Sequence, residues 1–344
     1  MKITQDALQK ITNDLAAKKS IHEAAFRIET ADGKTILSAA SSTIFEEKPF
    51  YIASINKLFV AALIFQLKAQ TKLNLDDYIK EYLPHQLIQG IHVFKGIDYT
   101  EQITIRHLLS HTSGLPCYLI DKMPDNNTLM DTLKEGHDLA IPTHKAMQYV
   151  REMQPKFKPG EKRKANYTNT NYHLLAEVVS VITGYSVDNE INRMMQELGM
   201  SDSFIIQNDN YYRIIPVRFQ QTNLKLQNFF HTSLYDIAST TADLMKFIKA
   251  YLGGGLFPKK QLEEMQDWRK IFFPFKYGMG LQMFYIPWIL APFQHVPQII
   301  GHCGSVGTVA FHIPEKDVYL TGTINQSAKP QLAFQALMKI VRKL

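Results

Sequence analysis

Alternating apolar and polar residues predict β-strands near both ends of the chain. Residues 22–29 and 35–40 have this pattern, and the Ala-Asp-Gly-Lys stretch at 31–34 predicts a turn between them. Residues 307–313 and 318–324 form a second pair, separated by a Pro-Glu-Lys-Asp turn. The sequence therefore predicts two β-hairpins, one close to each terminus.

Helical patterns accompany both hairpins. An amphipathic pattern runs from the N-terminus to about Lys18, and an apolar helix is expected over residues 331–344. The apolar run 58–65 contains neither Gly nor Pro and predicts a buried helix. This run is far shorter than the roughly 20 residues that span a bilayer, so we expect no transmembrane segment.

The distribution of these elements predicts an α+β fold. We expect an antiparallel sheet flanked by the N- and C-terminal helices, with a mainly helical lobe inserted between them. The α/β lobe would comprise about residues 1–75 and 235–344, and the helical lobe about residues 76–234. The whole chain, 1–344, would form a single catalytic unit with its cleft between the lobes.

Composition agrees with one large globular unit. The chain has 344 residues, of which 45% are hydrophobic and 20% are charged, which is enough to bury a large core. The formal net charge is +6, and its densest basic run lies at residues 156–164. A solvated loop is the default interpretation of such a run, although it could also attract anionic substrates. No nucleic-acid-binding motif accompanies it, so we expect no nucleic-acid partner.

Cysteine content and the N-terminal sequence bear on location. The two cysteines, Cys117 and Cys303, are too few for a disulfide framework and suit a reducing compartment. The first residues are polar and acidic where an export signal would be apolar. A cytoplasmic location is therefore expected.

Ser54 and Lys57 are the first candidates for catalysis. They lie three residues apart where an extended apolar stretch turns into the predicted helix 58–65, which places both side chains on one helical face. A serine hydroxyl is a poor nucleophile unless a neighbouring base activates it. The alternative is that Ser54 only caps the helix and that Lys57 is solvated.

Two further clusters follow in the chain. In the first, Tyr167 could exchange a proton with the serine and Asn169 could hold the lysine and a substrate carbonyl. In the second, the Gly-His-Cys-Gly-Ser-Val-Gly stretch at 301–307 predicts a strand whose glycines allow another backbone to approach closely. Each cluster alone is equally typical of a loop or a glycine-rich strand edge.

Together, the three clusters resemble the serine β-lactamase and penicillin-binding protein superfamily, whose signature combines S-x-x-K, S-D-N and K-T-G elements. Here Y-x-N and H-x-G replace the last two, as in the class C β-lactamase-like branch. That branch includes D-alanyl-D-alanine carboxypeptidases, D-amino-acid peptidases and esterases. Further segments with the same likeness lie at residues 104–116, 157–160, 171–175, 183–184 and 198–200.

The resemblance implies roles for these residues. Ser54 would be acylated, and the backbone N–H groups of Ser54 and Ser305 would form the oxyanion hole. Gly304 would let the substrate backbone lie against the strand, and Asn169 and His302 would orient the acyl group and a substrate carboxylate.

The resemblance also places the loop after Gly114 at the border of the pocket, so Cys117 and Tyr118 would line it. Either Lys57 or Tyr167 could be the general base.

The function implied is a serine hydrolase acting on a D-amino-acid peptide-like substrate or a small ester. A β-lactamase, or a penicillin-binding protein that acylates with little turnover, is the alternative. His302 stands where β-lactamases of this branch usually carry lysine, and its charge would depend on pH near neutrality, which disfavours β-lactamase activity. The thiols of Cys117 and Cys303 could be inert or sensitive to thiol reagents.

We expect no cofactor. We also expect no metal, because the pair His107 and His111 lacks the adjacent Glu of a zinc-protease helix. The partner would be a small-molecule or peptide substrate. The oligomeric state is left open.

Overall fold

The structure is a computed structural model that describes residues 2–42, 45, 47–285 and 296–344. Its main sheet has eight strands in the order β10-β11-β12-β13-β14-β15-β1-β2, and every neighbouring pair is antiparallel. The strands are β1 (Ala25–Thr30), β2 (Ile36–Ala40), β10 (Arg269–Lys270), β11 (Phe275–Tyr277), β12 (Gln282–Phe284), β13 (Ile299–Cys303), β14 (Val309–Ile313) and β15 (Val318–Thr323).

Both predicted hairpins are confirmed, and they join each other. β1 pairs with β2 on one side and with β15 on the other, with Ala25 opposite Thr323. The two hairpins therefore lie side by side in one continuous sheet, joined by the pairing of β1 with β15. The strands β10, β11 and β12, which the hydrophobic pattern did not predict, complete the other edge.

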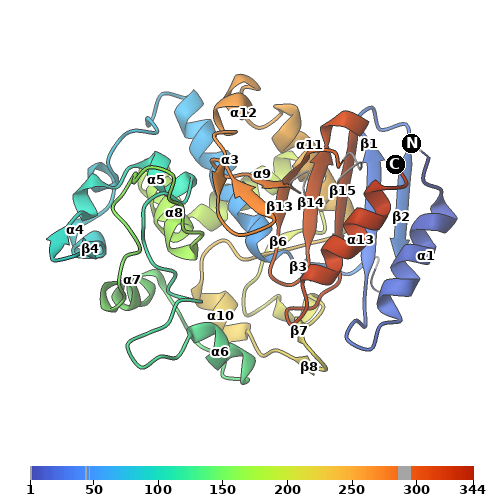
Figure 1. The fold of residues 1–344 in the computed structure, drawn as a ribbon, viewed down its shortest axis with the longest axis horizontal. Helices are drawn as coiled ribbons and strands as arrows, with labels where there is room; N and C mark the ends of the chain where they lie inside the picture. Colours follow the sequence, from blue (N-terminus) through green and yellow to red (C-terminus); the bar gives the residue numbers. More distant parts are fainter. Residues whose placement is uncertain (1, 43–44, 46, 286–295) are drawn as a thin grey trace.

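Helices cover both faces of this sheet (Figure 1). One face packs against α1 (Gln5–Ala16) and α13 (Gln331–Val341), which share a hydrophobic core with the sheet. α11 (Thr241–Gly253) covers the opposite face and contacts β1, β14 and β15. Because both faces are covered, every residue of β15 is buried. The predicted antiparallel sheet flanked by terminal helices is thus confirmed.

The middle of the chain is mainly helical. Its helices are α4 (His85–Ile88), α5 (Ile105–Leu109), α6 (Leu129–Lys134), α7 (Thr143–Glu152), α8 (Asn169–Thr183), α9 (Val187–Glu197) and α10 (Gln227–Thr232), and α12 (Lys260–Glu264) follows α11. Its short strands are β4 (Val93–Phe94), β5 (Ile97–Asp98), β6 (Phe204–Ile205), β7 (Arg218–Phe219) and β8 (Thr222–Asn223). β6 joins β9 (Ile237–Ser239) and β3 (Phe50–Tyr51) in a small sheet.

Helix α3 (Asn56–Ala69) connects the two halves. It is apolar nearly all round, which is typical of a helix buried on every side, and it packs against α8 and α9. On another side, Phe59 stacks on Phe247 of α11 with ring centroids 3.6 Å apart. The hydrophobic core is therefore continuous through α3, and the proposed division into two lobes at residues 75–76 and 234–235 remains a prediction.

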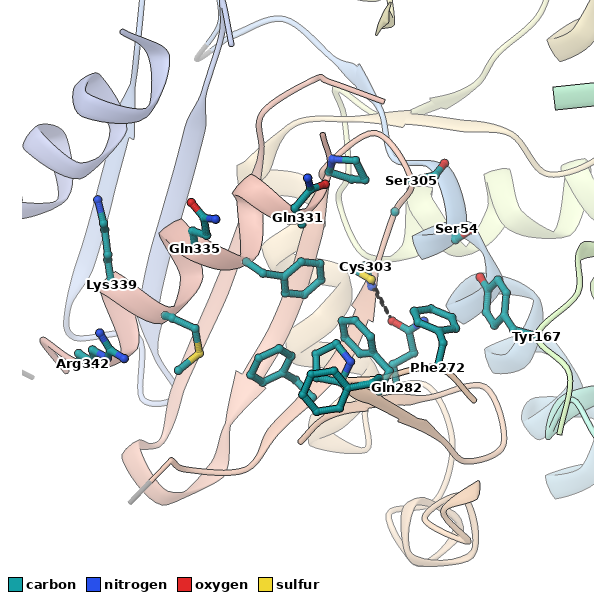
Figure 2. Close-up of a pocket in the computed structure, with 18 residues that line it drawn as sticks. Ser54, Tyr167, Phe272, Gln282, Cys303, Ser305, Gln331, Gln335, Lys339 and Arg342 are labelled. Carbon is teal, nitrogen blue, oxygen red and sulfur yellow. Dashed lines mark hydrogen bonds between the residues drawn. The ribbon is translucent and has the colours of Figure 1, made fainter. Parts of the chain in front are cut away.

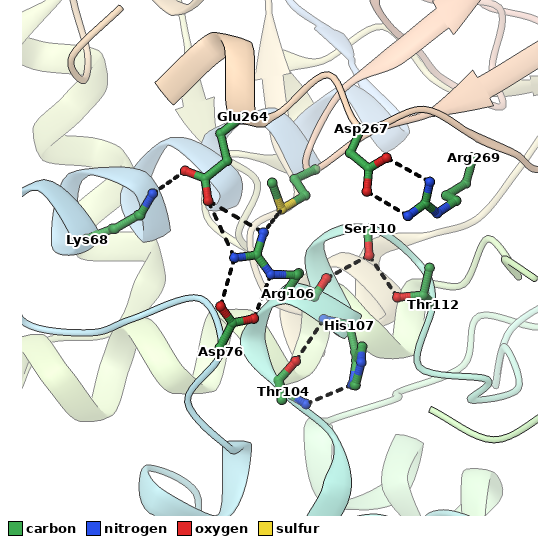
Figure 3. A network of polar contacts seen from close by, with 11 residues as sticks. Lys68, Asp76, Thr104, Arg106, His107, Ser110, Thr112, Glu264, Asp267 and Arg269 are labelled. Carbon is green, nitrogen blue, oxygen red and sulfur yellow. Dashed lines mark hydrogen bonds and ion pairs between the residues drawn. The ribbon is translucent and has the colours of Figure 1, made fainter. Parts of the chain in front are cut away.

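An ion-pair network also holds α3 to its surroundings (Figure 3). The Arg106 guanidinium donates to both carboxylate oxygens of Asp76 at 2.6 and 2.9 Å and lies 3.5 Å from Glu264. Glu264 also pairs with Lys68 near the end of α3. A bidentate pair of this kind fixes the orientation of the guanidinium relative to the carboxylate and also strengthens their interaction. The network therefore ties α3, α5 and α12 together on the side away from Ser54.

Among residues 2–42, 45, 47–285 and 296–344, no helix is both long and apolar enough to cross a membrane.

We predict that Phe59→Ala lowers the free energy of unfolding by about 3–5 kcal/mol, because it leaves a cavity between α3 and α11. Urea denaturation followed by circular dichroism measures this change. Tyr212→Ala is the matched control, because Tyr212 is 80% exposed and its loss should change stability by less than about 0.5 kcal/mol. Equal effects of the two changes would contradict a central packing role for Phe59.

Candidate active site

Ser54 lies in a single 3-10 turn, Ala53–Ile55, that leads directly into α3. Ala53 adopts a positive φ of 51°, a conformation that costs a non-glycine residue of order 1 kcal/mol and occurs mainly where the surroundings enforce it. This kink changes the chain direction just before Ser54. The Lys57 ammonium then donates to Ser54 Oγ at 3.2 Å, so the structure brings the predicted pair together.

The Lys57 side chain is buried, with 3% of the residue exposed. Burial disfavours the charged ammonium and lowers the pKa of Lys57 to about 8, although Cys117 and Asp236 oppose part of the change. The ammonium nitrogen lies 5.4 Å from the centre of the Tyr167 ring and 5.8 Å from that of Tyr172. A substantial neutral fraction of Lys57 is therefore accessible at mildly alkaline pH.

Tyr167 approaches the same point from the loop before α8. Figure 2 shows its hydroxyl directed towards Ser54. The oxygen is buried and has no hydrogen-bond partner among the described residues. Burial raises the pKa of Tyr167 well above its usual value, and the facing Ser54 hydroxyl offsets only part of that rise. The phenol is therefore protonated at physiological pH.

His111 holds the backbone on both sides of Tyr167. The carbonyl of His111 accepts the N–H of Asn166 at 2.8 Å, and its Nδ1 accepts the N–H of Thr168 at 3.2 Å. The Asn171 amide group contacts the same Nδ1 at 3.0 Å. Because a backbone N–H can only donate, Nδ1 is unprotonated and the ring carries its proton on Nε2.

His111 is fully buried, and its ring packs on that of Tyr167 with centroids 4.5 Å apart. Burial, with smaller contributions from Lys57 and His302, lowers its pKa well below the usual value, so the ring is neutral. His111 adopts a φ of 57° and lies beyond the end of α5. The helix that the sequence predicted through both His107 and His111 is therefore shorter than expected.

The end of β13 approaches Ser54 from the opposite side. A Cβ atom on Gly304 would lie 2.6 Å from the carbonyl oxygen of Ile52 and 2.9 Å from Ala53 Cβ, so glycine is required by the chain itself. Gly304 also lines a cavity with Ser54, and its role in making room for a substrate backbone remains a prediction. Thr308 Oγ1 donates to the same Ile52 carbonyl at 2.9 Å. These contacts fix β13 against the turn that carries Ser54.

Ser305 follows directly and is exposed. Its backbone N–H donates to no described residue. Ser54 lies in the first turn of its helical segment, where N–H groups lack partners within the helix. Among the described residues, neither the Ser54 N–H nor the Ser305 N–H donates a hydrogen bond, so the two groups expected to form an oxyanion hole are available to a ligand.

His302 lies in a different position from the one expected. It is fully buried, its Nε2 lies 3.2 Å from the hydroxyl of Tyr277, and its Nδ1 lies 2.8 Å from the carbonyl of Cys303. Burial is the main cause that lowers its pKa to about 3. The expectation that its charge varies near neutrality is therefore wrong, and the ring does not line either cavity at Ser54.

Asn169 and Tyr118 line a cavity with Ser54, whereas Cys117 does not. Cys117 is 2% exposed, and its Sγ accepts the N–H of Asn169 at 3.5 Å. A hydrogen bond thus holds the segment 115–118 to the start of α8. In this arrangement Tyr118 faces the cavity at Ser54 and Cys117 does not. The side-chain amide of Asn169 has no hydrogen-bond partner in the described parts of the chain.

Ser54 separates two cavities. The first, of about 260 Å³, lies on the side of α8 and β9, and Lys57, Asn169, Tyr118 and Asp236 are among its lining residues. The second is a groove of about 930 Å³ that runs from Ser54 and Tyr167 along β12 and β13 to α13 (Figure 2). Ser54 and Ser305 face both. A carbonyl group at Ser54 therefore has room on each side.

Sequence reasoning missed Asp236, a buried acceptor in the first cavity. It accepts hydrogen bonds from Tyr51 at 2.8 Å and from Asn56 at 3.3 Å, and it is bonded to Ser233. Burial raises its pKa to about 6 despite these donors. No motif surrounds Asp236 in the sequence, so nothing there identifies it.

Cys303 and Gln282 meet at the wall of the groove. The Gln282 carboxamide oxygen accepts the backbone N–H of Cys303 at 3.1 Å and its thiol at 3.2 Å. Burial raises the pKa of Cys303 to about 12, so the thiolate needed for reaction with thiol reagents is scarce. Gln282 lies on the unpredicted strand β12, and its position could not be found from a motif.

The basic run at 156–164 does not reach this site. Lys162 and Arg163 line a separate hollow with Arg106, His107 and Trp268. Within the described residues, no group of three or more His, Cys, Asp or Glu side chains is placed to hold a metal ion.

Three comparisons relate this chain to known proteins. A family model described as Beta-lactamase matches residues 8–342. The putative penicillin-binding protein PbpX of Bacillus subtilis is 26% identical over 223 residues, which are 63% of this chain and 49% of that protein. The chain thus spans about half the length of this curated relative.

Two solved structures share the fold. A D-amino acid amidase from Ochrobactrum anthropi has a TM-score of 0.78 at 19% identity and covers 98% of this chain and 96% of its own. A D-stereospecific amidohydrolase from Streptomyces sp. has a TM-score of 0.76 at 22% identity, over 97% and 98% of the two chains.

His111 is predicted to act as a positioning residue for Tyr167. His111→Leu removes the acceptor for the Thr168 N–H, and it should lower the rate at which Ser54 reacts with a fluorophosphonate by at least about tenfold, since a misplaced reacting group costs that much or more. His111→Asn offers an oxygen close to the position of Nδ1 and tolerates a positive φ, so it should recover most of the rate. Stopped-flow labelling by a fluorophosphonate, with thermal unfolding as the fold control, measures both. Equal rates for the two variants would contradict this role.

Proposed function

The chain belongs to the beta-lactamase family, and from that membership we propose that it is a serine hydrolase that forms an acyl-enzyme through Ser54. Its substrate would be an amide or ester of a D-amino-acid peptide-like compound, or a small ester. The observation that carries the proposal is the 3.2 Å contact between Ser54 Oγ and Lys57. Both groups face a cavity, and the lysine is buried enough to lose its proton.

In the proposed reaction, Ser54 Oγ attacks the substrate carbonyl carbon and its proton passes to the neutral Lys57 amine. The negative charge that develops on the carbonyl oxygen is stabilised by the N–H groups of Ser54 and Ser305. As the bond to the leaving group breaks, Tyr167 donates its proton to the leaving atom and receives one from Lys57. Water then attacks the carbonyl carbon of the ester on Ser54 and gives a proton to Lys57. The bond to Ser54 Oγ breaks, Ser54 Oγ regains a proton from Lys57 through Tyr167, and the carboxylic acid is released.

Lys57 is the stronger candidate for the general base. Its pKa lies at about 8, whereas burial moves the pKa of Tyr167 upward, away from the phenolate form. A base must be unprotonated at working pH to accept a proton. We therefore assign Lys57 as base and Tyr167 as proton donor, and Asn169 as the group that orients the acyl part.

Two observations support the proposed substrate class. The neutral His302 provides no fixed cation beside Ser54, which disfavours a β-lactamase because the substrate carboxylate lacks a partner. The folds of a D-amino acid amidase and a D-stereospecific amidohydrolase extend over nearly the whole chain. A penicillin-binding protein that acylates slowly is the second candidate, favoured by the similarity to PbpX. A cytoplasmic location remains a prediction from the sequence.

Ser54→Ala should abolish covalent labelling by a fluorophosphonate probe and turnover of p-nitrophenyl acetate. Intact-mass spectrometry of the labelled protein, followed by peptide mapping, locates the modified residue. Ser201→Ala is the matched control, because Ser201 is exposed and lines neither cavity at Ser54. Labelling that persists in Ser54→Ala would disprove the assignment. Nitrocefin measured alongside distinguishes a β-lactamase, and a stable acyl-enzyme distinguishes a penicillin-binding protein.

The acylation rate should rise with pH and level off above about 8. Lys57 has a pKa near 8, so below that value the protonated lysine cannot accept the serine proton and the rate should fall about tenfold per pH unit. The dependence of kcat/KM on pH for p-nitrophenyl acetate tests this. Lys57→Arg keeps the positive charge at every pH and should remove both the activity and this dependence. A rate that is constant between pH 6 and 9 would exclude Lys57 as the base.

A further inference from the structure

The groove beside Ser54 has an aromatic wall. Phe272 contacts both Tyr167 and Phe275 edge-on, with ring centroids 6.0 and 5.5 Å apart. Phe275 in turn contacts Phe284 and Phe334 at 5.7 and 5.0 Å. Phe272 is 49% exposed, which leaves part of this apolar surface uncovered. Such a surface favours an apolar or aromatic group of a ligand.

Gln282 presents hydrogen-bond donors to this groove in a fixed orientation. The atom that accepts the Cys303 N–H at 3.1 Å must be the carboxamide oxygen, because a backbone N–H can only donate. The carboxamide nitrogen therefore occupies the other position, where none of the described residues accepts its two protons. Gln282 is 1% exposed, yet it lines the groove together with Ser54 and Ser305. Its amide is thus a preorganised neutral donor with no partner among residues 2–42, 45, 47–285 and 296–344.

Among the described residues, the groove wall has no lysine or arginine beside this donor. All lysines and arginines lie within the described residues, and those that line the two cavities are Lys57, Lys134, Lys339 and Arg342. Lys57 is engaged by Ser54, and Lys134 is 3.3 Å from Asp131 and lines only the other cavity. Lys339 and Arg342 lie on α13 at the far end of the groove from Ser54 (Figure 2). A carboxylate beside Gln282 would therefore lose water without gaining a counter-charge, which is unfavourable.

The two cavities also differ in access. The groove is the larger, at about 930 Å³ against 260 Å³, and it extends along the surface to α13. The group released on acylation must depart before water attacks, and the groove, which extends along the surface, offers it a route. The acyl part would then remain in the smaller cavity with Asn169 and Tyr118.

We propose that the groove binds a neutral, apolar leaving group, and that Gln282 Nε2 donates to an uncharged carbonyl oxygen of that group. This inference rests on the proposed function and narrows it. The substrate would be an ester or an amide with no carboxylate adjacent to the bond that is cleaved. The protein would then act as an amidase, esterase or endopeptidase in preference to a carboxypeptidase.

The test follows cleavage of the bond between D-alanine and D-phenylalanine in N-acetyl-D-alanyl-D-phenylalanine and in its C-terminal carboxamide, which carries a neutral amide group where the first compound carries a carboxylate. We expect kcat/KM for the carboxamide to exceed that for the carboxylate by at least about tenfold, because a charge would be buried without a partner. Equal values, or a preference for the carboxylate, would overturn the proposal. Binding of the same two compounds to Ser54→Ala, measured by calorimetry, tests the preference without turnover. If Ser54→Ala binds the carboxylate and the carboxamide equally well, the groove assignment is overturned and the proposed function is not. If a fluorophosphonate fails to label Ser54 in the wild type, the proposed function itself is overturned.

Gln282→Glu keeps an oxygen for the Cys303 N–H and replaces the donor by an acceptor. It should lower kcat/KM for the carboxamide at least about tenfold, and Gln282→Leu should lower it about two- to tenfold, the range expected for one neutral hydrogen bond. Gln86→Glu makes the same chemical change at an exposed helical position outside both cavities and should leave kcat/KM unchanged. If both Gln282 variants fold, by circular dichroism, and turn over the carboxamide as the wild type does, Gln282 is not a substrate-binding residue.

Discussion

The close approach of β13 to the turn before Ser54 is the constraint on which the candidate site depends. At Gly304 the strand has no room for even a methyl group, because the Ile52 carbonyl and Ala53 occupy that space. Thr308 bonds to the same carbonyl, so the contact is held by a hydrogen bond as well as by packing. The hydroxyl of Ser54 and the N–H of Ser305 come from segments about 250 residues apart, and this contact sets them side by side.

Burial gives the polar groups of the site their chemistry. Lys57, Tyr167 and His302 are ordinary side chains whose pKa values are all moved by the same cause, the loss of water around the charged form. The direction differs with the charge: the lysine and the histidine lose protons more easily, and the tyrosine keeps its proton more firmly. The result is a lysine that loses its proton easily, a protonated phenol and a neutral imidazole close together. Once Lys57 is deprotonated, none of the three groups carries a charge.

Local patterns predicted the parts of this protein that local interactions determine. The hairpins around β1–β2 and β14–β15, the buried helix α3 and the proximity of Ser54 to Lys57 follow from periodicity, turn residues and helical spacing. The positions of His302 and Cys117 could not be predicted, because burial depends on which segment packs over a residue. His302 is enclosed by Tyr277 from the short strand β11, and Gln282 becomes relevant only through its pairing with Cys303. Both partners belong to two- or three-residue strands that carry no periodicity to detect.

The H-x-G element carries His302 where β-lactamases of this branch usually carry lysine, and this difference affects the groups around it. A lysine at position 302 would be a buried cation close to Lys57, and two like charges there would each disfavour the other. A neutral histidine removes that repulsion and donates or accepts within the sheet, between Tyr277 and the Cys303 carbonyl. The recognition of a substrate must then rely on neutral groups at the strand edge, of which Cys303 is already committed to Gln282. The charge absent from position 302 and the carboxamide protons of Gln282, which none of the described residues accepts, therefore both favour an uncharged ligand.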